Sequence, residues 1–149
     1  MSNATIHATA IVDKGAMIGN GTAVGPYTVI EDDVQVGCDC QIGPHTVLGS
    51  GTRLGDRCRV FPGACLGLIP QDLKFVGEKT YLHVGDDTTV RECATLNRGT
   101  KARGETRIGS HCLVMAYCHV GHDCVIGDHV VLANNLAMAG HVEVGDYAT

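Results

Sequence analysis

The chain has 149 residues, a net charge of −5, 20 glycines and 8 cysteines, and aromatic residues make up only 4%. An acidic chain without a basic block is not typical of nucleic-acid-binding proteins, and no apolar run approaches the ~20 residues of a membrane-spanning helix. The amino-terminus lacks the apolar segment of a signal peptide. We therefore expect a cytoplasmic protein with one domain over residues 1–149, whose core is filled by small aliphatic side chains.

An aliphatic residue recurs at every sixth position from Ile6 to Leu66, from Val84 to Leu96 and from Ile108 to Val144. The following residue is glycine at 12 of these 21 positions. A period of six matches neither an α-helix nor an alternating hairpin, and it predicts a short strand followed by a turn. Since side chains alternate along a strand, the aliphatic residue and the residue two before it face the interior. The repeat therefore predicts an all-β fold, a parallel β-helix. The sequence also resembles hexapeptide-repeat proteins, and this resemblance implies three strands in each coil of 18 residues. We expect the glycines to adopt the backbone angles of tight corners.

Most of the cysteines follow the same repeat. They stand two residues before an aliphatic position, where a free thiol packs as a small apolar group. The CxxC pairs that are typical of structural zinc sites are absent from the sequence. We predict that five cysteines are buried, unpaired core residues: Cys40, Cys58, Cys112, Cys118 and Cys124.

The repeat is interrupted twice. Beyond the first run of repeats, the step of six would place Asp72 and Glu78 inside the coil, which is costly without partners. We therefore predict projecting loops over residues 67–80 and 97–106. Loops on a rigid scaffold commonly carry binding groups, although tolerated insertions are the alternative. The candidates for polar ligand contacts in the first loop are Gln71, Asp72 and Lys74.

Four of the eight histidines lie in "AYCHVGHDCVIGDHVVLANNLAMAGHVEVGD", residues 116–146. One coil of 18 residues places Gly140 over His122 and His141 over Asp123, and His119 faces outward from the flat wall. A corner imidazole then has a carboxylate beside it and a glycine amide above it. A general base needs such an orienting partner and a donor for developing negative charge, so this corner is a candidate catalytic site.

Two other interpretations of the histidines are open at this point. Most polar corner residues of a coiled fold are simply solvated, and we expect this of His129. The second alternative is zinc, because hexapeptide-coil carbonic anhydrases bind zinc through histidines of neighbouring coils. His83, His119 and His122 approach that pattern, but the last gap is too short and Cys124 stands where the third ligand is expected. We therefore expect no metal.

Three motifs carry a resemblance to a known family: "PQDLKFVGE" (residues 70–78), "RGT" (residues 98–100) and "HVGHDCVIGDHVVLANNLAMAGHVEV" (residues 119–144). Over essentially its whole length the chain resembles the UDP-N-acetylglucosamine O-acyltransferases, which begin lipid A synthesis in Gram-negative bacteria. The resemblance implies a left-handed parallel β-helix built from hexapeptide repeats, with two projecting loops, assembled as a homotrimer. It also implies transfer of a 3-hydroxyacyl group from acyl carrier protein to the sugar 3-hydroxyl, without a metal or bound cofactor.

The resemblance also implies roles for single residues. His122 would be the base, Asp123 would orient it, and the Gly140 amide would stabilise the oxyanion. Asn97 stands where some family members carry a histidine. The residues implied in binding the nucleotide sugar are His119, His141, Gln71, Asp72 and Lys74.

Family members continue through further coils and a helical domain, whereas this chain ends in mid-repeat at Thr149. We interpret it as a truncated member, and a non-catalytic trimeric scaffold is the alternative function. The sequence leaves open the acyl-chain length and the choice between a 3-hydroxyl and a 3-amino acceptor sugar.

Overall fold

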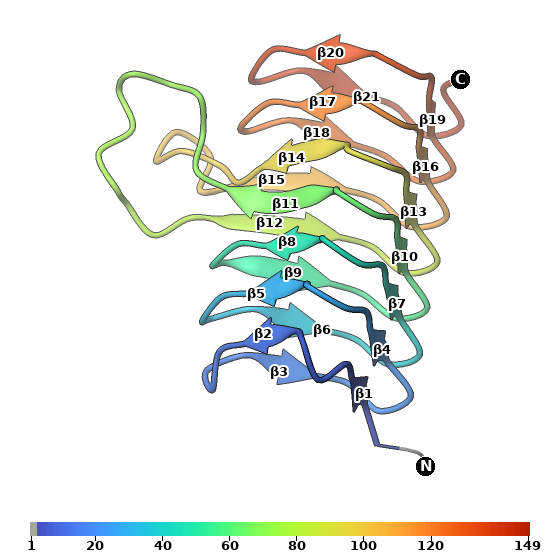
Figure 1. The fold of residues 1–149 in the computed structure, drawn as a ribbon. Helices are drawn as coiled ribbons and strands as arrows, with labels where there is room; N and C mark the ends of the chain where they lie inside the picture. The colour runs from blue at the N-terminus through green and yellow to red at the C-terminus, as the bar shows by residue number, and fades with distance from the viewer. Residues whose placement is uncertain (1–2) are drawn as a thin grey trace.

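The computed structural model describes residues 3–149, and its 21 short strands wind into a stack of coils with three walls (Figure 1). Each strand contains one of the 21 aliphatic positions of the repeat, and neighbouring strands of a wall run parallel. Within residues 3–149 there is no helix, and so none that could cross a membrane. The parallel β-helix predicted from the six-residue period is confirmed.

Each wall is a seven-stranded sheet to which every coil adds one strand. The first wall consists of β1 (Thr5–Ile6), β4 (Ala23–Val24), β7 (Gln41–Ile42), β10 (Arg59–Val60), β13 (Thr89–Val90), β16 (Leu113–Val114) and β19 (Val131–Leu132). The second wall consists of β2 (Ile11–Val12), β5 (Val29–Ile30), β8 (Val47–Leu48), β11 (Cys65–Leu68), β14 (Thr95–Asn97), β17 (His119–Val120) and β20 (Ala137–Met138). The third wall consists of β3 (Met17–Ile18), β6 (Gln35–Val36), β9 (Thr52–Leu54), β12 (Tyr81–Val84), β15 (Glu105–Ile108), β18 (Val125–Ile126) and β21 (Glu143–Val144).

The strands of each wall pair in the same register before and after both interruptions of the repeat. Ile42 pairs with Val60, eighteen residues on, whereas Val60 pairs with Val90, thirty residues on. The first projecting loop supplies the twelve additional residues of that coil. The loops therefore leave the stack without shifting it, and the coils beyond them stay aligned with the coils before them.

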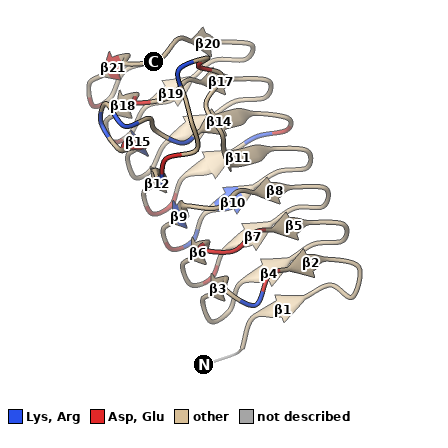
Figure 2. Ribbon diagram, turned by 90° about the vertical axis from the view of Figure 1, so that its left-hand side faces the viewer, with Lys and Arg blue, Asp and Glu red and all other residues tan. Residues whose placement is uncertain are grey.

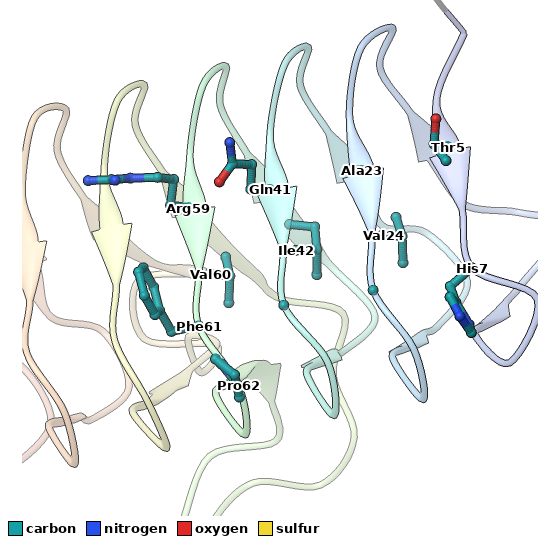
Figure 3. Close-up of a pocket in the computed structure, with 12 residues that line it drawn as sticks. Thr5, His7, Ala23, Val24, Gln41, Ile42, Arg59, Val60, Phe61 and Pro62 are labelled. Carbon is teal, nitrogen blue, oxygen red and sulfur yellow. The ribbon is translucent and has the colours of Figure 1, made fainter.

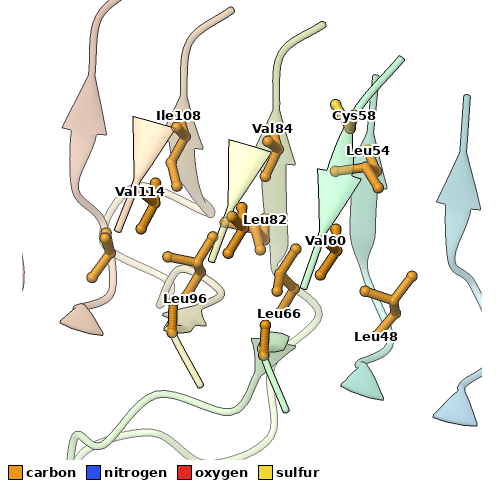
Figure 4. Close-up of a cluster of buried hydrophobic side chains, with 14 of the residues drawn as sticks. Leu48, Leu54, Cys58, Val60, Leu66, Leu82, Val84, Leu96, Ile108 and Val114 are labelled. Carbon is orange, nitrogen blue, oxygen red and sulfur yellow. The ribbon is translucent and has the colours of Figure 1, made fainter. Parts of the chain in front are cut away.

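The interior is filled by the aliphatic positions of the repeat (Figure 4). The five predicted cysteines are buried and unpaired, so that prediction is confirmed. Besides packing, their thiols form hydrogen bonds with backbone carbonyl groups. The Cys40 thiol donates to the Gly55 carbonyl one coil above at 3.1 Å, and the Thr28 hydroxyl donates in the same way to Gly43 at 3.0 Å. Thiol and hydroxyl groups at this position of the repeat therefore link successive coils by hydrogen bonds.

The corners differ from the prediction. Among the twelve glycines that follow an aliphatic position, only Gly67, where the first loop leaves the stack, has a positive φ. The left-handed residue stands two places later, as at His45 with φ of 56° and Asp123 with φ of 59°. Glycine is needed for another reason, because a Cβ added to Gly43 would lie 2.8 Å from the carbonyl oxygen of Val60. The close stacking of the coils, and not the corner angle, excludes a side chain there.

The two loops are shorter than predicted and leave the same corner, between the second and third walls (Figure 1). They cover residues 69–80 and 98–104, because the strands at their bases are extended by pairing. Leu68 pairs with Asn97, and Tyr81 pairs with Glu105. The strands β11, β12, β14 and β15 therefore hold both loops at fixed positions along the stack.

Acidic and basic residues are interspersed along the side of the stack that Figure 2 shows. Elsewhere on the stack opposite charges pair, as Arg57 does with Asp87 at 2.8 Å and Arg107 with Glu105 at 2.7 Å.

Replacing Gly43 by alanine should test the stacking constraint. The added methyl group would meet the backbone of the next coil, so we expect Gly43→Ala to lower the free energy of unfolding by about 1–3 kcal/mol. Gly145 is the matched control, because a Cβ at that repeat position meets no atom within 4 Å. Urea unfolding of both variants provides the comparison, and an equal effect at the two positions would contradict the explanation.

Candidate active site

The corner that follows β17 lies against the corner one coil further on, which follows β20. The His141 amide donates to the His122 carbonyl at 2.9 Å, so the predicted stacking of these two corners is observed. A Cβ added to Gly140 would lie 2.5 Å from Cε1 of His122. The imidazole therefore occupies the space that a side chain at Gly140 would need.

Asp123 is completely buried, because the second loop closes over its carboxylate. Oδ1 accepts hydrogen bonds from the amides of Thr100 at 3.0 Å and Arg103 at 3.2 Å. Oδ2 accepts one from the Thr100 hydroxyl at 2.6 Å and lies 2.8 Å from Nδ1 of His122. Burial alone would raise the pKa of Asp123, but the hydrogen bonds from Thr100 and His122 outweigh it and hold the pKa below its ordinary value. The group is therefore a carboxylate at neutral pH.

The contact with Asp123 decides how His122 presents its imidazole. A carboxylate 2.8 Å away favours the tautomer whose proton is on Nδ1, which leaves Nε2 as the acceptor. The side chain of His122 is 18% exposed, so the imidazole is partly open to the outside. The ring of His141 stands edge-on to that of His122, with 5.1 Å between their centroids. This geometry is the one that a general base requires.

Two neighbouring hollows surround this corner. The histidine pocket, of about 380 Å³, is lined by Gln71, Asn97, His119, Gly121, His122, Gly140 and the segment 137–139. The lysine pocket, of about 160 Å³, is lined by Asp72, Lys74, Phe75, Glu78, Thr100, Lys101, Ala102 and His141. Seven of the eight predicted site residues line one of the two pockets, and the eighth, Asp123, lies buried beside His122. Their individual roles stay predictions.

His119 faces outward from the second wall, as predicted. Its Nδ1 lies 2.8 Å from the Thr95 hydroxyl, which belongs to the strand one coil below. Burial lowers the pKa of His119 and so favours the neutral imidazole. His119 is therefore placed as an uncharged hydrogen-bonding group on the wall of the histidine pocket.

Sequence reasoning missed Thr100 as a site residue, although the "RGT" motif contains it. Its amide and hydroxyl supply two of the four hydrogen bonds that Asp123 receives. The six-residue period carries no information on how a loop outside the repeat folds back onto a corner. The motif was the only signal available.

The remaining histidines lie apart from this corner. His83 pairs with Glu105 at 3.1 Å on the third wall, whereas His119 lies on the second wall, so the chain does not assemble the zinc trio considered from the sequence. His129 is exposed, as expected, and its ring stacks between those of His111 and Tyr147, with 4.8 Å between centroids on each side.

In residues 3–149, one group of three possible metal-ligating side chains has its ligand atoms within 4.8 Å of one another, namely His122, Asp123 and His141. Both oxygens of Asp123 are already occupied by hydrogen-bond donors. The geometry therefore matches proton transfer better than metal binding.

A larger hollow of about 490 Å³ lies on the first wall (Figure 3). Val24, Ile42, Val60, Phe61 and Pro62 contribute to its mainly apolar lining. It contains none of the predicted site residues.

The chain is similar to a set of acyltransferases along nearly its whole length. The family description "Bacterial transferase hexapeptide (six repeats)" matches residues 105–136. An acyl-[acyl-carrier-protein]–UDP-N-acetylglucosamine O-acyltransferase of Thiobacillus denitrificans is 49% identical over 146 residues, which are 97% of this chain and 57% of that protein. The corresponding protein of Chlorobium phaeobacteroides is 68% identical over 115 residues, 77% of this chain and 44% of that protein.

Solved structures agree with these relatives. LpxA of Acinetobacter baumannii superposes with a TM-score of 0.94 and 43% identity, and the match covers 95% of this chain and 55% of that one. The UDP-N-acetylglucosamine acyltransferase of Francisella novicida superposes with a TM-score of 0.94 and 35% identity, over 96% of this chain and 52% of that one. The chain belongs to the UDP-N-acetylglucosamine O-acyltransferase family. The left-handed parallel β-helix that the resemblance implied is thereby confirmed. The chain spans about half the length of the curated relatives that it matches.

In this member of the acyltransferase family, removing the Thr100 hydroxyl should show how strongly the second loop stabilises Asp123. We expect Thr100→Val to lower the free energy of unfolding at neutral pH by about 1.5–3 kcal/mol, because it removes a hydrogen bond to a buried charge. A group with a lowered folded-state pKa contributes stability above its unfolded pKa, and this contribution is lost as the pH falls through the folded-state pKa. The difference in the free energy of unfolding between the wild-type chain and Thr100→Val should therefore shrink in acid.

Thr80→Val is the matched control, because the Thr80 hydroxyl is equally buried but has no hydrogen-bond partner in residues 3–149. We expect this variant to keep or raise the stability. Urea titrations at a series of pH values measure both effects. The explanation is wrong if Thr100→Val is neutral or if its effect does not change with pH.

Proposed function

We propose that this chain carries the acyl-transfer centre of a UDP-N-acetylglucosamine O-acyltransferase, which catalyses the first step of lipid A biosynthesis. In the proposed reaction a 3-hydroxyacyl group moves from acyl carrier protein to the 3-hydroxyl of UDP-N-acetylglucosamine. The supporting observation is the His122 imidazole, which is held by Asp123 through Nδ1 and lies beneath Gly140 at the edge of a pocket. The names of the relatives supply the two substrates. On the same resemblance we place the reaction in the cytoplasm.

In the proposed mechanism, Nε2 of His122 takes the proton from the sugar hydroxyl as its oxygen attacks the thioester carbonyl carbon. The carbonyl oxygen becomes an oxyanion, and the Gly140 amide supplies a hydrogen bond to it. Within residues 3–149 that amide donates to no acceptor. The carbon–sulfur bond then breaks, the carrier thiolate leaves, and His122 returns the proton to it. Asp123 stabilises the imidazolium while it carries the proton.

The two pockets differ in charge, which supports division of the nucleotide sugar between them. Gln71 and His119 give the histidine pocket neutral hydrogen-bonding groups, as a sugar ring requires. The lysine pocket instead carries charges of both signs, because Asp72 and Glu78 line it together with Lys74 and Lys101. The two lysines are suited to phosphate groups. We propose that Gln71, Asp72, Lys74, His119 and His141 bind the UDP-N-acetylglucosamine.

We also propose that the chain forms a homotrimer through the second wall, which places the histidine pocket in a groove between subunits. The outward positions of the three walls differ in polarity. The first wall presents one charged residue, Arg59, among Thr5, Ala23, Gln41, Thr89, Leu113 and Val131. The third wall presents three charged residues, Arg53, Arg107 and Glu143. The second wall presents no Lys, Arg, Asp or Glu at its seven outward positions, which are Ile11, Val29, Val47, Cys65, Thr95, His119 and Ala137. An apolar sheet face of this kind favours association.

Replacement of His122 should test the proposed chemistry. General base catalysis typically contributes about 10²–10⁴-fold, so His122→Ala should lower turnover by about this factor while the fold and sugar binding are kept. His119→Ala should act mainly on KM, because that residue does not lie beside Gly140. Acyl transfer from acyl carrier protein to UDP-N-acetylglucosamine is the assay.

His129→Ala is the control, since that histidine stacks at another corner, and it should leave turnover nearly unchanged. Near-normal turnover of His122→Ala, or an equal loss in His129→Ala, would remove the catalytic assignment. A wild-type chain that binds the sugar nucleotide without turnover would instead favour the non-catalytic scaffold.

A charge on the second wall should test the trimer. Val47 faces outward there, so Val47→Glu can be accommodated within one chain but would bury a carboxylate in the proposed interface. We expect this variant to sediment as a monomer where the wild-type chain sediments as a trimer. Gln41→Glu adds the same charge to the first wall and should leave the trimer intact. Trimers of both variants would show that the second wall is not the interface.

A further inference from the structure

Asn97 departs from the repeat at the edge of the histidine pocket. It directly follows the aliphatic Leu96, at the position that is glycine in 12 of 21 repeats. Of the nine residues other than glycine at this position, Asn97 alone is buried, with 6% of its surface exposed. Departures from a structural rule concentrate at functional sites, so this residue calls for an explanation.

The carboxamide of Asn97 also lacks a partner. Its Oδ1 is buried and accepts no hydrogen bond from residues 3–149, and its side chain makes no other hydrogen bond in that range. Nearly all buried polar atoms in folded proteins are paired, because an unpaired one costs free energy. The folded chain therefore carries a cost at Asn97, which a ligand donor would remove once the amide turns its oxygen toward the pocket.

The position of Asn97 shows which ligand could supply this donor. Leu96 pairs with Val120, so Asn97 lies one coil beneath Gly121. Gly121 has no side chain that could fill the space above Asn97. Both residues line the histidine pocket, together with His119 and His122. A ligand whose reacting hydroxyl meets His122 therefore comes within reach of the Asn97 amide.

We propose that Asn97 is a substrate-binding residue whose carboxamide positions the acceptor sugar by pairing with one of its hydroxyl or N–H groups. A half-turn about the last side-chain torsion exchanges the oxygen and nitrogen, so the group can present either an acceptor or a donor to the pocket. Its uncharged amide is suited to a neutral sugar ring and adds no charge beside His122. The inference rests on the proposed function and adds to it a residue that fixes the acceptor.

The alternative is that Asn97 serves only to fill the corner. The two roles predict opposite changes in the stability of the free protein when Asn97 is replaced. If the side chain only supports the fold, replacing it lowers stability. If it is kept for a ligand, a leucine of similar size removes an unpaired buried oxygen and leaves the free protein as stable or more stable. The same change removes a hydrogen bond from the complex and weakens binding.

The test uses the 149-residue chain, with UDP-N-acetylglucosamine as the probe in titration calorimetry and thermal unfolding without ligand. For Asn97→Leu we expect a rise in Kd of about threefold to tenfold, which corresponds to one hydrogen bond between uncharged groups. The Tm should stay the same or rise by about 2–4 °C. Asn97→Ala should weaken binding similarly. Asn134→Leu makes the same change at an exposed corner outside the pocket and should leave Kd unchanged.

An unchanged Kd in both Asn97 variants would overturn the inference while the proposed function stands. A fall in Tm of both variants, or their failure to fold, would overturn it as well and assign Asn97 to the fold. If the wild-type chain does not bind the probe, the proposed function fails and this inference fails with it.

Discussion

The close stacking of successive coils is the constraint on which the rest of the structure depends. Each strand except the first and last of its wall pairs with the strands above and below, so the backbone of one coil lies against that of the next. This contact excludes a side chain at Gly43, and it brings the Cys40 thiol within reach of the Gly55 carbonyl. It also sets His122 beneath Gly140. The same spacing therefore determines the composition of the core, the glycines and the geometry of the candidate site.

The candidate site needs something that the repeat alone does not provide, namely a buried charge. A wall of the stack offers backbone hydrogen bonds and small side chains, and neither would hold a carboxylate away from water. The second loop does so, because Thr100 and Arg103 direct three donors at Asp123. Rigid coils thus fix the spacing of the site, and an insertion into one coil fixes its electrostatics.

Much of this could be predicted from the sequence, because the features that follow the period are local. The strands, the buried cysteines and the stacking of Gly140 over His122 all result from counting residues. The corner glycines were misinterpreted, since the period shows that a side chain is disfavoured but not which contact excludes it. The burial of Asp123 and the contact of Thr100 could not be predicted, because they depend on a loop whose path the repeat does not determine.

A comparison of aspartates at the same position of the repeat, but at different corners of the coil, shows how one of them becomes distinct. Asp39, Asp87 and Asp123 follow the same rule of the repeat, with φ of 55°, 57° and 59°. Asp39 is exposed, and Asp87 lies partly exposed beside Arg57, which lowers its pKa through a surface ion pair. Only Asp123 of the three is buried, because only its corner lies under the second loop. Backbone and residue type are the same in all three, so the surroundings that the loop creates separate a candidate catalytic carboxylate from an ordinary corner residue.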